Sequence, residues 1–268
     1  MSTMILDRPA GWLSYDVTGT GRLVLCSPGF GDLRSTFREL ADRLAGAGLR
    51  AATTDLRGHG ETSVGWPRYT GADVAEDMLA VAAHLSDEPV VLVGNSFSAD
   101  AAILAAARHP ERVAALVVTG PFVRDPQPNL VKRILSWLAS RPGIGRVLWR
   151  FAWPSFFGPH RPDTFAARRA ELMANLAEPG RFDAVRGMMA STHAPADIAL
   201  PDVTCPVLVV MGEVDPDFPD PAAEARYIAE RAGGETTVLM VPEAGHYPHY
   251  ERVDVVAPAV IDFVRGLG

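Results

Sequence analysis

The chain of 268 residues carries a formal net charge of −7, with 48% hydrophobic and 21% charged residues. This composition suits one large globular domain, or one domain with an insertion, and the negative charge argues against a nucleic-acid partner. No apolar run approaches the roughly 18 residues that a membrane-spanning helix needs, so no membrane partner is expected.

The compartment is expected to be the cytoplasm. The N-terminal residues lack the basic start and apolar stretch of a secretory signal. Cys26 and Cys205 lie in or beside apolar, strand-like runs and are interpreted as reduced core residues.

Strand and helix patterns alternate along most of the chain. Strands are predicted at 12–17, 22–26, 51–55, 90–93, 113–118, 207–211 and 237–241. Helices are predicted at 37–45, 74–85, 99–108, 222–231 and 253–265. Gly19-Thr20-Gly21 is a hairpin signal between the first two strands. The alternation favours an α/β fold with a mainly parallel sheet between two layers of helices.

Residues 122–200 interrupt this alternation with helical runs broken by Pro and Gly, and hold 11 basic and 6 acidic side chains. The segment is interpreted as a helical cap over the carboxyl ends of the strands, with 1–121 and 201–268 forming the core. Its large apolar side chains are candidates for substrate contact: Trp137, Trp149, Trp153, Phe156 and Met188. The alternative is that these side chains only form the core of the cap.

Gly94-Asn95-Ser96-Phe97-Ser98 lies between the strand at 90–93 and the helix at 99–108. This is the layout of a nucleophile elbow, where a sharp turn lifts a serine hydroxyl above the sheet edge. The positions two before and two after the serine must be small, and Gly94 and Ser98 meet this need. The alternative is a helix N-cap, in which Ser96 or Ser98 does no chemistry.

Together with three other motifs, the elbow resembles the α/β-hydrolase family over nearly the whole chain. The motifs are Cys26-Ser27-Pro28-Gly29-Phe30-Gly31, Asp55-Leu56-Arg57-Gly58-His59-Gly60, and the order Ser96, Asp215, His246. The resemblance implies a mainly parallel sheet of the eight-stranded type with an inserted cap. It also implies a structural role for His59, which bonds loop backbone in this family.

Acyl transfer by a serine needs a base and a group that orients the base. Ser96 is the predicted nucleophile, His246 the base that takes its proton, and Asp215 the carboxylate that orients the imidazole. Asp217 and Glu213 flank Asp215 and are its rivals. His249 lies three residues after His246, so a metal-binding pair is an alternative, although neither a metal nor another cofactor is expected.

The negative charge that develops on the substrate oxygen needs two preorganised donors. The backbone N–H groups of Phe30 and Phe97 are the candidates, with Gly29 permitting the turn. Ser27-Pro28 replaces the histidine that the family usually has before this glycine. The backbone donors do not depend on that side chain, although the rigidity of the loop does.

The triad and its oxyanion donors predict hydrolysis of a carboxylic ester through an acyl-enzyme, and the aromatic cap favours a small to medium apolar ester. A lactonase, a perhydrolase and a carbon–carbon bond hydrolase share the same triad. The carbon–carbon hydrolase would need inward-pointing cap arginines such as Arg133, Arg150 or Arg186. With serine at position 98, the elbow also resembles the G-x-S-x-S elbow of receptor-like hydrolases that turn over slowly. The expected partner is a small-molecule ester, and monomer and homodimer both stay open.

Overall fold

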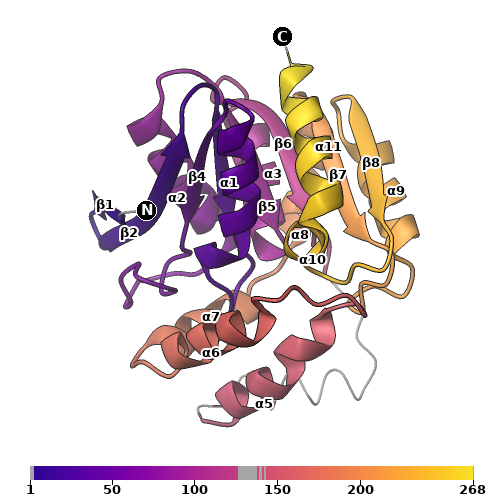
Figure 1. The fold of residues 1–268 in the computed structure, drawn as a ribbon. Coiled ribbons are helices and arrows are strands. Elements are labelled where there is room, and N and C mark those ends of the chain that lie inside the picture. Colours follow the sequence, from indigo (N-terminus) through magenta and orange to yellow (C-terminus); the bar gives the residue numbers. More distant parts are fainter. Residues whose placement is uncertain (1–2, 126–137, 139–140, 142, 268) are drawn as a thin grey trace.

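The computed structural model describes residues 3–125, 138, 141 and 143–267, and one sheet forms its centre (Figure 1). The strands are β1 (Met4–Arg8), β2 (Gly11–Gly19), β3 (Leu23–Ser27), β4 (Arg50–Thr54), β5 (Val90–Asn95), β6 (Val113–Thr119), β7 (Val207–Gly212) and β8 (Thr236–Val241). Their order is β1-β2-β4-β3-β5-β6-β7-β8. The pairs β1–β2 and β2–β4 are antiparallel and all others are parallel. The predicted fold class is confirmed.

The hairpin expected between the first two strands is wrong, because β4 lies between β2 and β3. Gly19 and Gly21 do turn the chain at positive φ, 76° and 98°. However, β2 pairs antiparallel with β4, with Tyr15 opposite Thr54. The turn residues indicate only that the chain changes direction locally, whereas the strand with which β2 or β3 pairs depends on the whole sheet. The edge strand β1 was not predicted, because its five residues are mostly exposed and show no buried run.

Helices cover both faces of the sheet (Figure 1). They are α1 (Arg38–Gly46), α2 (Gly71–Leu85), α3 (Phe97–Arg108), α5 (Ile144–Ala152), α6 (Phe165–Asn175), α7 (Arg181–Met189), α8 (Ala194–Ala199), α9 (Pro221–Arg231), α10 (Pro248–Glu251) and α11 (Val253–Arg265). On one face, α1 and α11 bury their apolar side chains against β3–β7. On the other face, α2, α3, α8 and α9 do so. The central strands are therefore apolar on both sides, as parallel strands require.

The helices α5, α6 and α7 lie together below the sheet in Figure 1. A separate aromatic cluster holds them against the core, and it includes Trp153, Phe157 and Tyr247. The division into a core and a cap at residues 122–200 stays a prediction.

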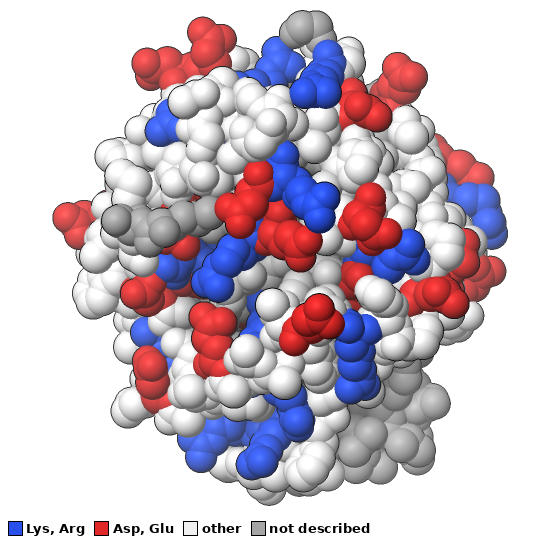
Figure 2. Space-filling model, in the orientation of Figure 1, with Lys and Arg blue, Asp and Glu red and all other residues white. Residues whose placement is uncertain are grey.

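Both cysteines are free thiols, with Cys26 buried in β3 and Cys205 half-buried. Among the described helices, none has the length and apolar character needed to cross a membrane. On the face drawn in Figure 2, acidic and basic side chains are interspersed rather than gathered into one patch of either sign.

Candidate active site

The chain makes a sharp turn where β5 ends at Asn95 and α3 begins at Phe97. Between them, Ser96 has φ 54° and ψ −116°, a conformation that is costly for a residue with a side chain. Gly94 makes the turn possible, because a Cβ there would lie 2.2 Å from the Ser98 carbonyl oxygen. This strained turn presents Ser96 at the carboxyl edge of the sheet.

The two serines of the elbow differ in their contacts. The Ser96 side chain makes no capping hydrogen bond to α3. The Ser98 hydroxyl is buried and donates to the Pro28 carbonyl at 2.5 Å, and it lies 3.0 Å from the Ser27 hydroxyl. The N-cap alternative therefore does not describe Ser96, and Ser98 ties the start of α3 to the loop after β3.

His246 and Asp215 come from loops that follow neighbouring strands, β8 and β7. Their side chains are buried, and His246 Nδ1 lies 2.8 Å from Asp215 Oδ2 in a hydrogen bond. The rival Asp217 is farther, with Oδ2 at 3.5 Å from the same nitrogen. Burial lowers the pKa of His246, but the charges of Asp215 and Asp217 outweigh it and raise this pKa to about 9. The imidazole is therefore cationic at neutral pH.

A buried carboxylate organises the loop that carries His246. Glu251 accepts hydrogen bonds from the backbone N–H groups of Gly245 and Tyr247, on either side of His246. It also accepts from Gly158 N–H at 2.8 Å. Because Gly158 belongs to the segment between β6 and β7, Glu251 joins that segment to the histidine loop.

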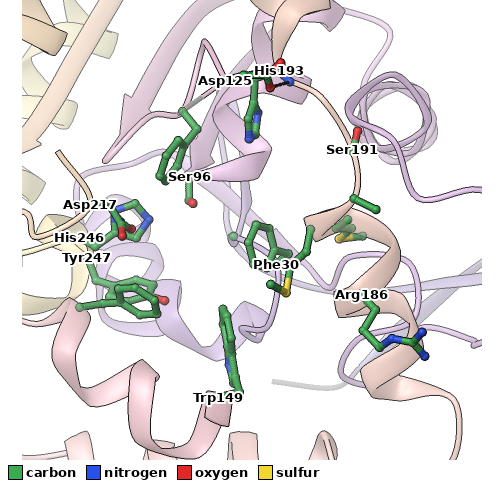
Figure 3. A pocket seen from close by; sticks show the side chains of 16 residues that line it. Phe30, Ser96, Asp125, Trp149, Arg186, Ser191, His193, Asp217, His246 and Tyr247 are labelled. Atoms are coloured by element: carbon green, nitrogen blue, oxygen red, sulfur yellow. Dashed lines mark hydrogen bonds and ion pairs between the residues drawn. The ribbon is translucent and has the colours of Figure 1, made fainter. Parts of the chain in front are cut away.

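Ser96 and His246 line the same pocket, which has a volume of about 340 Å³ (Figure 3). Of the predicted contact residues, Trp149, Phe156 and Met188 also line it. Trp153 is fully buried in the aromatic cluster instead, stacked on Phe165. Trp137 lies outside the described residues.

The loop after β3 approaches the nucleophile closely. A Cβ on Gly29 would lie 2.9 Å from Ser96 Cβ, so only glycine fits there. This places the backbone at Phe30 beside Ser96, and the Phe30 ring meets the Phe97 ring edge-on at 5.9 Å. The N–H groups of Phe30 and Phe97 stay the candidates for the oxyanion hole.

His59 and Trp149 hold this loop from two sides. The Gly31 N–H donates to His59 Nε2 at 2.9 Å, and His59 Nδ1 lies 3.1 Å from the Arg57 carbonyl. Burial lowers the pKa of His59 to about 4, so the ring is neutral and can accept. The Trp149 indole N–H donates to the Gly31 carbonyl at 3.1 Å. His59 thus has the structural role that the resemblance implied.

His249 does not form a metal-binding pair with His246. Its two ring nitrogens contact the hydroxyls of Thr36 at 3.1 Å and Thr119 at 3.0 Å, and its ring stacks on Phe37. Burial holds the pKa of His249 well below its usual value. Over the described residues, the side chains grouped closely enough to ligate a metal are Asp215, Asp217 and His246.

Several pocket residues were missed by sequence reasoning: Phe122, Asp125, Ser191, His193 and Tyr247. Tyr247 could have been found, since it follows His246 directly. His193 carried no motif, and its place in the pocket depends on how the segment 122–200 packs. No pattern in the sequence signals that packing.

The sheet order, the elbow and the residues that follow the strands define an α/β hydrolase. The chain belongs to the alpha/beta hydrolase family, whose model matches residues 23–259.

Among its relatives, a pimeloyl-[acyl-carrier protein] methyl ester esterase of Neisseria meningitidis serogroup A is 29% identical over 247 residues, which cover 89% of this chain and 75% of that protein. A 2-(acetamidomethylene)succinate hydrolase of Mesorhizobium japonicum is 28% identical over 260 residues, covering 92% and 89%. The structure of a thermophilic esterase from Thermogutta terrifontis matches with a TM-score of 0.81 and 23% identity, over 100% of this chain and 99% of that one. This last likeness concerns the fold alone.

Proposed function

We propose that the protein is a serine carboxylesterase with Ser96, His246 and Asp215 as its triad. The observation that carries the proposal is the hydrogen-bonded pair of His246 and Asp215 in one pocket with a serine held at positive φ. The relatives named as esterases support ester hydrolysis as the reaction.

The geometry suggests the following sequence of events. In its deprotonated form, the His246 ring takes the proton from the Ser96 hydroxyl as the serine oxygen attacks the ester carbonyl. The Phe30 and Phe97 N–H groups donate to the oxyanion. When the intermediate collapses, the imidazolium gives its proton to the departing alcohol. Water then attacks the acyl-enzyme, again through His246, which releases the acid and restores Ser96.

The pocket favours a small to medium ester with an apolar part. Its volume of about 340 Å³ is at the small end for ligand sites. Aromatic and methionine side chains form much of its wall: Phe30, Phe122, Trp149, Phe156, Met188 and Met189.

A second candidate function is the hydrolysis of an acidic substrate, for example at a carbon–carbon bond. This function depends on Arg186. This side chain lines the pocket opposite His246, and it also pairs with Asp183 (Figure 3). Arg150 is exposed, and Arg133 lies outside the described residues. Among the described residues that line the pocket, Arg186 is the only Lys or Arg, and it gives a dianion weaker support than the apolar wall gives an apolar ester.

Steady-state hydrolysis of p-nitrophenyl esters from acetyl to dodecanoyl tests the proposal. We expect turnover above about 1 s⁻¹ with a short-chain optimum. Ser96→Ala should lower kcat by at least about 10³ with an unchanged circular dichroism spectrum. Ser155→Ala, at an exposed serine, is the matched control.

Two results would contradict the proposal in different ways. Retained turnover in Ser96→Ala would remove Ser96 as nucleophile. An inactive wild-type protein that a fluorophosphonate labels at Ser96 would keep the nucleophile but reject the esterase, in favour of the carbon–carbon hydrolase or a receptor-like protein.

A further inference from the structure

The pocket contains a second histidine, His193, which the proposed triad does not use. It lies just before α8, and Figure 3 shows its ring directed into the pocket from the side opposite Trp149. The ring stacks on Phe122 at 5.5 Å, and the same phenyl group makes an edge-to-face contact with the His246 ring at 5.7 Å. His193 is thus one aromatic ring away from the proposed catalytic base.

A buried aspartate fixes the orientation of this ring. His193 Nδ1 lies 2.8 Å from Asp100 Oδ2, and Asp100 is on α3, one helical turn after Ser96. Asp100 is 1% exposed, and its other oxygen has no hydrogen-bond partner among the described residues. A buried carboxylate needs the donor that Nδ1–H supplies. The proton therefore sits on Nδ1.

The second ring nitrogen is left to the pocket. A ring that carries a single proton, on Nδ1, presents Nε2 as a hydrogen-bond acceptor. It makes no hydrogen bond within the part of the chain that the structure describes. Two carboxylates adjoin the ring, since Asp100 accepts from Nδ1–H and Asp125 accepts from the His193 backbone N–H at 2.6 Å. Two carboxylates beside the ring disfavour an anionic ligand.

We propose that His193 is a specificity residue, which accepts a hydrogen bond from a hydroxyl or amide N–H group on the substrate. The inference rests on the proposed ester hydrolysis and adds to it. The preferred ester would be apolar next to the scissile bond and carry one donor farther along the chain. Asp100 would hold the imidazole in the orientation that meets this substrate donor. Asp100 is therefore a positioning residue.

Matched methyl esters test this assignment, with product formation followed by pH-stat. The set is methyl hexanoate, methyl 6-hydroxyhexanoate and monomethyl adipate, together with the three eight-carbon analogues. The quantity compared is the ratio of kcat/KM for the hydroxy ester to that for the plain ester. In His193→Phe, which keeps an aromatic ring, this ratio should fall by about fivefold or more, because a buried hydroxyl loses its partner.

Two further variants separate binding from folding. His193→Phe leaves Asp100 unpaired, so the double variant Asp100→Asn/His193→Phe removes the buried charge as well and should show the same fall in the ratio. His160→Phe makes the same substitution at an exposed site and should keep the wild-type ratio.

Binding to Ser96→Ala protein, measured by calorimetry, decides the question without turnover. The ratio of the Kd values for the two esters should change with His193→Phe as the kinetic ratio does, even if the wild-type protein hydrolyses no ester. An unchanged ratio in both measurements would overturn the proposal. The proposal would also be overturned if neither ester bound. A loss confined to monomethyl adipate would also overturn it, because it would mean that a cationic ring binds a carboxylate.

Discussion

At the scale of single residues, two carboxylates act on one imidazole. Asp215 makes the hydrogen bond to His246, while Asp217 contributes its charge from 3.5 Å. Burial alone would lower the pKa of this imidazole, yet the pKa is raised to about 9. In the resting protein at neutral pH the proposed base therefore already holds a proton.

The proposed base must lose this proton before it can act, so kcat/KM should rise with pH and level off near pH 9. Asp217→Asn removes one of the two charges and should move the rising limb to lower pH. The measurement is a pH profile for one ester from pH 5 to 10. Glu213→Gln, at the exposed neighbouring carboxylate, is the control and should leave the limb in place. A limb that Asp217→Asn does not move would contradict this account.

The same shift in pKa links the histidine to folding. Because the folded-state pKa of His246 lies above its ordinary value of 6.5, protonation favours the folded state. That contribution is fully present below about pH 6.5 and is lost as the pH rises toward 9.

At the scale of elements, the elbow and the loop after β3 support each other. The histidine usual before Gly29 in this family is replaced by Ser27-Pro28, which put the rigidity of the loop in question. The structure supplies a different support, because the Ser98 hydroxyl donates to the Pro28 carbonyl from the first turn of α3. The last position of the elbow, which is glycine in the common G-x-S-x-G motif, is Ser98 here, and its hydroxyl has a structural role.

Ser98→Ala should leave the Pro28 carbonyl without its donor and lower the free energy of unfolding by about 1–3 kcal/mol. It should also lower kcat more than it raises KM, because the loop carrying the Phe30 N–H loosens. Urea unfolding and ester kinetics measure the two effects. Ser155→Ala, which removes an exposed hydrogen bond to the Ala152 carbonyl, is the control. Wild-type kcat in Ser98→Ala would show that this bond does not support the loop.

The same scale shows what the sequence can predict. The buried strands and their helices have local patterns, so the strand at Val90–Asn95 and the helix after it were located within two residues. The proposed triad could also be read from the sequence, because each member lies in a recognisable turn or loop after a predicted strand. The pairing of β2 with β4 could not be predicted from the sequence, since strand order depends on distant segments. His193 was missed for the same reason, because its pocket position arises from packing between α3 and the segment before α8.

At the scale of the whole molecule, buried and partly buried polar contacts join the helices below the sheet to the rest of the chain. Arg168 on α6 forms an ion pair with Asp32 in the loop after β3, and both side chains are buried. Asn175, at the end of the same helix, makes two hydrogen bonds of 3.0 Å with the backbone of Gly60. The pocket lies between the parts that these contacts connect.

Arg168→Met should leave the Asp32 carboxylate buried without its cation and lower the free energy of unfolding by about 3–5 kcal/mol. Burial already raises the pKa of Asp32, and loss of the Arg168 guanidinium would raise it further. Urea unfolding measures the change. Arg169→Met, at the next residue, should cost far less, since among the described residues that guanidinium donates only to the Arg150 carbonyl, in an exposed hydrogen bond. Equal losses in the two variants would contradict the role of the ion pair.

The two thiols have a practical consequence for labelling the protein with a fluorophore. Burial raises the pKa of Cys26 far above neutrality and that of Cys205 to about 11, so both stay protonated and react slowly with alkylating dyes. A cysteine placed at Phe151, which is 70% exposed on α5, would be the fast-reacting one. The natural chain is therefore already a suitable background for a single fluorophore that reports on movement of α5 relative to the sheet.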